Sequence, residues 1–131
     1  MRTRSVVTAT LAGLALTAGL GAQAQAQVRT QANPPCYANG DGSLNCGNTA
    51  PAKIYSKADW GSPHPEDPPP RVVDTLRSNP SWFKCYVRGD HHSGGNNVWY
   101  YTVGDDSNKW GYVPAYSLYT NPDPFPGVRR C

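Results

Sequence analysis

The chain has 131 residues, of which 12 are basic and nine acidic, for a formal net charge of +3. This charge excess is too small for a typical nucleic-acid-binding protein, which would carry a strongly basic surface. Thirteen glycines and thirteen prolines argue against long helices and favour an all-β protein of short strands joined by turns.

The first 26 residues predict a secretory signal peptide. Arg2 and Arg4 form a positive start, an apolar stretch follows at 6–20, and small residues at alternating positions lead up to Ala26. The apolar stretch is too short and too interrupted to span a membrane. We therefore expect a secreted, extracellular protein that starts near Gln25 or Gln27, does not insert into a membrane after cleavage, and forms one domain with ten basic and nine acidic residues.

Four cysteines follow the predicted signal peptide, at positions 36, 46, 85 and 131. An even number in an exported protein predicts two disulfides, and three pairings are possible. We favour Cys36–Cys46, which closes a short loop around the turn sequence 39–42, and Cys85–Cys131, which ties residue 131 to a strand. Zinc is the alternative, but the spacing contains no CxxC pair, so no metal is expected.

Residues 27–51 predict an extended tail that ends in the disulfide-closed loop 36–46, either a cap on the domain or a presented epitope, with the cap favoured. Residues 52–131 form the predicted domain. Alternating apolar and aromatic residues predict strands at 52–58, 71–76, 82–88, 98–103, 110–113 and 118–120. The segments between them predict a stiff proline-rich loop at 62–70, a polar loop at 89–97, a hairpin tip at 104–109, a 3₁₀ turn at 115–118 and a C-terminal wrap at 121–130.

The stretch Val98–Leu118 resembles the C-terminal half of bacterial SH3-like (SH3b) domains. That family has a W-x-x-V strand, a hairpin tip and then W-G-Y-V-x-x-x-x-L, which here is Trp110–Leu118. The resemblance extends over about residues 52–120, and its specific part is the W-G-Y-V-P segment. It implies a small five-stranded SH3-like barrel of the secreted actinobacterial type, to which this chain adds an extended N-terminal tail and two disulfides.

No pattern in the sequence predicts an enzyme or a cofactor. His91 and His92 are adjacent and would point to opposite faces of a strand, which favours a solvated loop over a metal site. The paired cysteines leave no thiol for catalysis. Carboxylates at positions 59, 66, 67 and 74 could form a glycosidase pair, but that chemistry needs a cleft that a domain of this size rarely builds.

Four tryptophans and eight tyrosines exceed what a core of this size can bury, so several should lie on the surface. We place Trp99, Val113 and Leu118 in the core. The predicted surface aromatic residues are Tyr55, Trp60, Tyr100, Tyr116 and Tyr119. As an alternative, Trp99, Tyr101, Trp110 and Tyr112 form cross-strand pairs that are alternately core and half-buried.

The SH3-like resemblance also implies a ligand groove between the loop after the first strand and the turn after the last hairpin. By position, that groove would use Tyr55, Trp60 and Tyr116. Arginines could frame it by charge or cation–π contacts, namely Arg71, Arg77 and Arg88.

These features favour binding over chemistry and leave three hypotheses. The first is an adaptor subunit of an exported complex, which docks other secreted proteins through its aromatic face and through the tail 27–35, a segment able to add a strand to a sheet edge. Small adaptor subunits of secreted actinomycete toxin particles are similar in size and layout. The second, implied by the resemblance, is binding to cell-envelope peptidoglycan. The third is inhibition of a hydrolase by the loop 36–46.

Overall fold

The computed structural model describes residues 33–131, in which eight short strands form two antiparallel sheets. These residues contain no α-helix and no helix long enough to cross a membrane; one 3₁₀ turn, η1, covers Ala115–Ser117. The all-β prediction is therefore confirmed. The predicted signal peptide and residues 27–32 of the predicted tail lie outside the described residues.

The smaller sheet has the order β1 (Tyr37–Ala38), β2 (Leu44–Cys46) and β5 (Ser81–Phe83). The predicted Cys36–Cys46 disulfide joins the start of this hairpin to its second strand. Leu44 and Cys46 are fully buried and belong to the hydrophobic core. The disulfide-closed segment is thus part of the core and not a cap on its surface, because its second strand pairs with β5.

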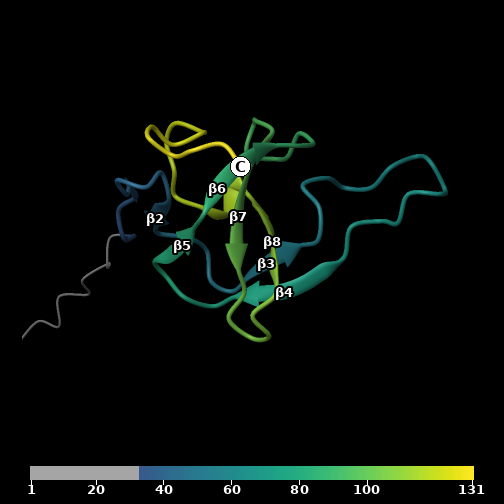
Figure 1. Cartoon of the computed structure of the whole chain (residues 1–131), viewed down its shortest axis with the longest axis horizontal. Helices are drawn as coiled ribbons and strands as arrows, with labels where there is room; N and C mark the ends of the chain where they lie inside the picture. The colour runs from purple at the N-terminus through teal and green to yellow at the C-terminus, as the bar shows by residue number, and fades with distance from the viewer. Residues whose placement is uncertain (1–32) are drawn as a thin grey trace, which may run out of the picture. The chain divides into compact units, whose positions relative to one another are not determined.

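The larger sheet has the order β4-β3-β8-β7-β6 (Figure 1). Its strands are β3 (Ala52–Tyr55), β4 (Val72–Leu76), β6 (Cys85–Arg88), β7 (Val98–Val103) and β8 (Trp110–Pro114). The prediction for β7 is confirmed at both ends, and those for β4 and β8 are within one residue. Within residues 33–131 the edge strands β4 and β6 do not pair with each other, so hydrogen bonds do not close this sheet into a barrel.

The predicted strand 52–58 is too long, since β3 ends at Tyr55, and two other strand predictions are wrong. The predicted strand 82–88 is divided at Lys84, because its first half, β5, pairs with β2 and its second half, β6, pairs with β7. The predicted final strand 118–120 reduces to a single bridge between Leu118 and Asn48. These last two differences arise from pairing with the N-terminal segment, which we expected to be an extended tail.

The core lies under the inner face of the larger sheet and includes Ile54, Val98, Tyr100 and Val113. Val113 and Leu118 are buried as predicted, but the prediction of an exposed Tyr100 is wrong, since its side chain is 0% exposed. The Tyr100 hydroxyl donates to Asp123 Oδ1 at 2.8 Å and accepts from the Phe125 N–H at 2.9 Å. These C-terminal partners satisfy the hydroxyl in the core, where burial raises the pKa of Tyr100.

The C-terminal segment wraps the domain as predicted and ends along β6. The Tyr86 N–H donates to Arg129 O at 3.1 Å, and the Cys131 N–H donates to Tyr86 O at 2.9 Å. The second predicted disulfide, Cys85–Cys131, holds the end of this segment. Two disulfides are typical of proteins that fold in an oxidising compartment.

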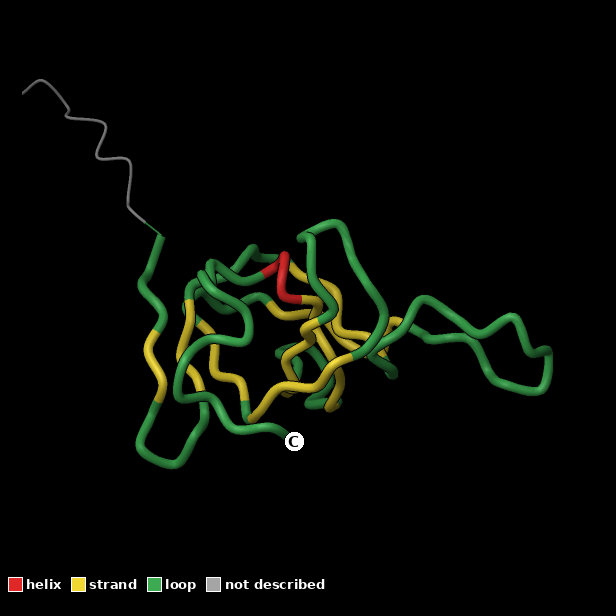
Figure 2. Tube along the Cα trace, turned by 90° about the horizontal axis from the view of Figure 1, so that it is seen from above, coloured by secondary structure: helices red, strands yellow, loops and turns green. Residues whose placement is uncertain are grey.

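A long loop, residues 56–71, extends away from the strands, and we call it the finger (Figure 2). At its base the Ser56 N–H donates to Arg71 O at 2.8 Å, and the Arg71 N–H donates to Ser56 Oγ at 2.9 Å. At its tip the Asp67 N–H donates to His64 O at 3.1 Å. Residues 62–69 are all exposed, which confirms the predicted proline-rich loop.

Candidate binding surface

The outer face of the larger sheet is aromatic. Neighbouring residues on a strand point to opposite faces of the sheet. Tyr100 and Val113 point inward to the core, so their neighbours Trp99, Tyr101 and Tyr112 point outward. The register then sets Tyr55 beside Tyr112, and Tyr112 beside Tyr101, in one row across three strands. The outward face of an antiparallel sheet is ordinarily polar. An aromatic outer face is typical of a surface that binds something.

At one end of this face, five rings form a group that we call the groove cluster. Its members are Tyr55, Trp60, His92, Trp99 and Tyr116. The Trp60 ring lies 4.8 Å from that of Trp99 and 5.4 Å from that of Tyr55. Trp99 is fully buried at the base of the cluster, whereas Trp60 remains 44% exposed above it. Trp99 is therefore buried as predicted, although by the rings of the outer face and outside the inner core.

Trp60 is held in place by the loop between β6 and β7. Its indole Nε1–H donates to His91 O at 2.9 Å, and its backbone N–H donates to Asp90 Oδ2 at 3.0 Å. The Trp99 indole donates to Asp90 O at 2.9 Å. An exposed aromatic ring that is already fixed loses little conformational entropy on binding. Trp60 is thus preorganised as a contact residue.

His92 is a structural member of the cluster. The prediction of a solvated loop is wrong for this residue, which is 8% exposed, although His91 is exposed. The Gly94 N–H donates to His92 Nδ1 at 3.1 Å, so Nε2 carries the proton and donates to Val98 O at 2.8 Å. Its ring lies 5.3 Å from that of Tyr116. Across residues 33–131, no three His, Cys, Asp or Glu side chains gather as metal ligands.

A cavity of about 200 Å³ adjoins the groove cluster between Tyr55 and Tyr116. Its other lining residues are Thr49, Pro51, Ala52, Lys53 and Ser117. Burial raises the pKa of Tyr116, and the neighbouring Tyr55 hydroxyl raises it further. The structure therefore brings together Tyr55, Trp60 and Tyr116, the three residues that the SH3-like resemblance implied for a groove.

The other candidate residues are placed apart. Arg71 closes the base of the finger through its backbone. Tyr119 is exposed but donates its N–H to Gly47 O, away from the cluster. Arg77 pairs with Asp106, and Arg88 donates to Asn97 Oδ1 at 3.0 Å, so their guanidinium groups have partners elsewhere.

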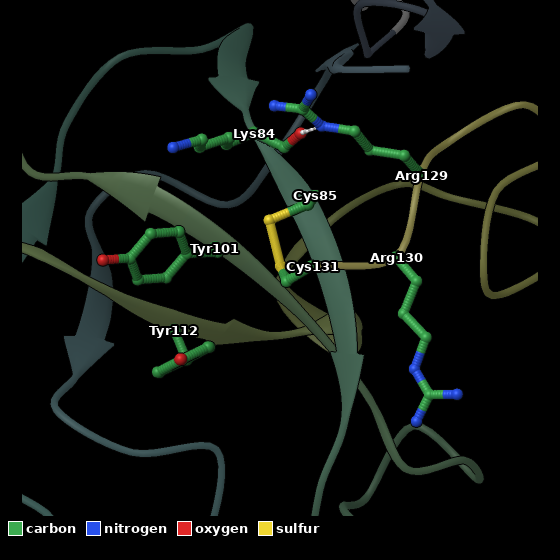
Figure 3. Close-up of a pocket in the computed structure, with 7 residues that line it drawn as sticks. All are labelled: Lys84, Cys85, Tyr101, Tyr112, Arg129, Arg130 and Cys131. Carbon is green, nitrogen blue, oxygen red and sulfur yellow. Dashed lines mark hydrogen bonds between the residues drawn. A yellow bond between two sulfur atoms is a disulfide. The ribbon is translucent and has the colours of Figure 1, made fainter.

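At the other end of the aromatic face lies a second cavity of about 520 Å³, which we call the basic cavity (Figure 3). Its lining residues are Lys84, Cys85, Tyr101, Tyr112, Arg129, Arg130 and Cys131. Beside it the Trp110 ring stacks on that of Tyr101 at 5.3 Å, and Lys84 Nζ lies 5.6 Å from the Trp110 ring centre. The pairing of half-buried Tyr101 and Tyr112 confirms one part of the predicted alternative of cross-strand pairs. The rest is wrong, because Trp99 lies opposite Pro114, and Trp110 lies opposite Val103 and is exposed.

Sequence reasoning missed the basic cavity as a site. Arg129 and Arg130 line it because the Cys85–Cys131 disulfide holds the C-terminal segment against β6. The Arg129 side chain points toward Lys84, whereas that of Arg130 points away from Tyr101 and Tyr112 (Figure 3). The sequence feature that could have revealed this site is the predicted Cys85–Cys131 disulfide. It places two arginines beside β6, whose neighbouring strand β7 carries aromatic residues.

Comparisons of this chain with protein-family models, with curated proteins and with solved structures return no match.

Proposed function

We propose that this chain is a secreted, non-catalytic protein–protein interaction module on an SH3-like scaffold, and that it serves as an adaptor subunit of an exported complex. The observation that carries the proposal is the aromatic outer face, with exposed Trp60 and Tyr116 at one end and exposed Trp110 at the other, where the ring of Trp82 from β5 lies 6.2 Å from that of Trp110. Exposed tryptophan and tyrosine are the residues on which protein interfaces concentrate their binding energy.

Two further observations support binding over catalysis. The carboxylate of Asp74, one of the candidate catalytic acids, accepts backbone N–H groups from residues 106, 107 and 109 and is occupied in folding. The Trp60 side chain is fixed by hydrogen bonds yet exposed, which suits recognition of a preformed partner surface. The tail 27–35 remains part of the proposal as a second contact segment.

The test is affinity capture from the organism's own culture supernatant with the tagged mature protein. We expect stoichiometric secreted proteins to be recovered with the wild type and lost with Trp60→Ala or Tyr116→Ala. Tyr37→Ala is the matched control, because Tyr37 is an exposed tyrosine on the smaller sheet. Circular dichroism of each variant checks that the fold is retained. Recovery of no protein partner would contradict the adaptor proposal.

A second candidate function is binding to cell-envelope peptidoglycan. The cavity of about 200 Å³ beside Tyr55 and Tyr116 favours it, because that position matches the groove implied by the SH3b resemblance. Sedimentation with purified cell walls distinguishes the two functions. Retention on walls that is lost in Trp60→Ala, with no protein partner captured, would replace the adaptor by the envelope binder.

A further inference from the structure

The basic cavity has cationic side chains that form no ion pair within the described residues, although Asp41 lies near enough to Arg129 for the guanidinium to help lower the pKa of that carboxyl. The ion pairs among residues 33–131 are His64–Glu66 and Arg77–Asp106, and neither involves Lys84, Arg129 or Arg130. Arg129 Nε donates to a backbone carbonyl, Lys84 O, at 3.3 Å. The cavity is therefore complementary to an anionic group next to an apolar or planar one.

The tip of the finger carries the opposite charge, as two carboxylates that accept no hydrogen bond from any described residue. In the described part of the chain, every carboxylate except those of Glu66 and Asp67 accepts at least one hydrogen bond. Glu66 has one weak contact, with His64 Nδ1 at 3.8 Å, and both side chains are exposed. They lie in the turn at the tip of the finger, so the finger presents two carboxylates at its end.

The composition of the finger also matches the basic cavity. Prolines at positions 63, 65, 68, 69 and 70 stiffen the loop and lower the entropy that docking would cost. Proline-rich segments dock on aromatic-lined grooves, and the basic cavity is lined by Tyr101 and Tyr112 beside exposed Trp110. Long exposed loops of this kind usually serve a function of their own.

We propose that the finger of one molecule docks in the basic cavity of a second copy, with Glu66 and Asp67 facing Lys84 and Arg129. Within one molecule the finger makes no hydrogen bond or ion pair with these residues, which favours a contact between copies. The finger and the basic cavity are different surfaces, so the contact is heterologous, or head-to-tail. Repetition of such a contact produces either an open chain of molecules or a closed ring. Its small area makes the association weak and reversible.

The test is sedimentation equilibrium of the mature protein from about 10 µM to about 1 mM, at low and at high salt. We expect the average mass to rise with concentration at low salt and to fall back to that of the monomer at high salt. Arg129→Glu should abolish the rise, whereas the matched control Lys109→Glu, on the hairpin tip, should retain it. Thermal melts check that each variant folds, and both side chains are exposed.

A charge-reversal experiment makes the test specific. The finger variant Glu66→Lys/Asp67→Lys and the cavity variant Arg129→Glu/Arg130→Glu should each be monomeric, because finger and cavity then carry like charges. Mixed at equal concentration they should associate again, since each finger meets an oppositely charged cavity. A wild type that stays monomeric at about 1 mM and low salt, or a mixture that stays monomeric, overturns the proposal.

Binding of a synthetic peptide of residues 60–71 shows whether the occupant of the basic cavity is a second copy of this chain or a different protein. If the peptide binds the cavity but the whole protein does not self-associate, the occupant is an acidic segment of a different protein and the second copy is excluded. The proposed adaptor function is tested by partner capture through the groove cluster, which Tyr116→Ala removes. Tyr116 lies in η1, outside both the finger and the basic cavity, so self-association should be unchanged in Tyr116→Ala and the two proposals fail independently.

Discussion

Two loops of this domain carry adjacent acidic residues and use them in opposite ways. In the loop 104–109, between β7 and β8, Asp105 Oδ2 accepts the N–H groups of Arg77 and Ser78 at 2.6 and 2.9 Å. In the finger, Glu66 and Asp67 accept no hydrogen bond from any described residue. Carboxylates therefore hold the loop 104–109 to the sheet, where backbone N–H groups converge on them. In the finger, which offers them no such donors, they stay available for a partner.

The largest effect should come from Asp74, which anchors the loop 104–109 to β4. Its carboxylate accepts N–H groups of the loop at 2.9–3.2 Å, so Asp74→Ala leaves several backbone donors without a partner. We expect a fall in Tm of roughly 10 °C or more, measured by thermal denaturation. Asp67→Ala in the finger is the control and should leave Tm unchanged. Equal losses in both variants would contradict the contrast between the loops.

The next largest effect should come from Gly104, which adjoins the same anchor. A methyl group at this position would overlap the Asp74 side chain, so Gly104→Ala must displace either the loop or the carboxylate. We expect a loss of about 1–3 kcal/mol in the free energy of unfolding, measured by urea denaturation. Gly40→Ala is the matched control, since a methyl group there meets nothing within 4 Å. A Gly104→Ala variant as stable as that control would show that the loop is not held closely.

Acid should weaken the anchored loop selectively. The Lys109 N–H lowers the pKa of Asp74, and the Arg77 guanidinium lowers the pKa of Asp106. A carboxyl whose pKa is lower in the folded state stabilises the fold above its unfolded pKa, near 4, and loses that contribution as the pH falls through its folded value. The urea concentration at the unfolding midpoint should therefore decrease when the pH is lowered below about 4. The difference in this midpoint between wild type and Asp74→Asn should become smaller over the same pH range. A difference that is constant with pH would contradict this.

A smaller effect is expected for the exposed ion pair at the same loop. Arg77 Nε and Nη2 donate to Asp106 at 2.6 and 2.9 Å, but both side chains are solvent-exposed. Arg77→Gln should lower Tm by no more than about 3 °C, and added salt should reduce the difference. A loss as large as that of Asp74→Ala would mean that the pair, and not the buried carboxylate, holds the loop.

The smallest effect on stability should come from removing the tip of the finger. Replacing residues 62–69 with a short Gly-Ser linker removes exposed residues only and keeps the base formed by Ser56 and Arg71. Because loop length has a small effect on the free energy of unfolding, Tm should change by less than about 3 °C. Self-association should be lost in the same variant. A large fall in Tm would instead assign the finger a structural role.

Local sequence patterns predicted the local structure well. The alternation of β7 and its flanking turns fixed both ends of that strand, and the turn at 39–42 pointed to the Cys36–Cys46 pairing. The division of 82–88 at Lys84 could not be predicted, because it depends on pairing with β2, 35 residues or more earlier in the chain. Local patterns do not report such long-range partners.

The candidate site was predictable in part for the same reason. Tyr55, Trp60 and Tyr116 meet as expected, since their positions follow the order of the strands. Alternation predicted that Trp99 and Tyr100 point to opposite faces but could not say which face is inside, because both faces of β7 carry aromatic residues. The inward position of Tyr100 depends on Asp123 of the C-terminal segment, which accepts a hydrogen bond from the buried hydroxyl.

The contact between the two ends of the described chain bears on when the protein can fold. The N–H of Arg129 donates to Gly42 O at 2.8 Å, Gly127 lies against Ala38, and Cys131 bonds to Cys85. The first hairpin is therefore secured by residues at the opposite end of the described chain. Neither end can complete its contacts until the other is in place. Folding of the first hairpin and folding of the C-terminal segment are thus one coupled event, even though the two segments are far apart in the sequence.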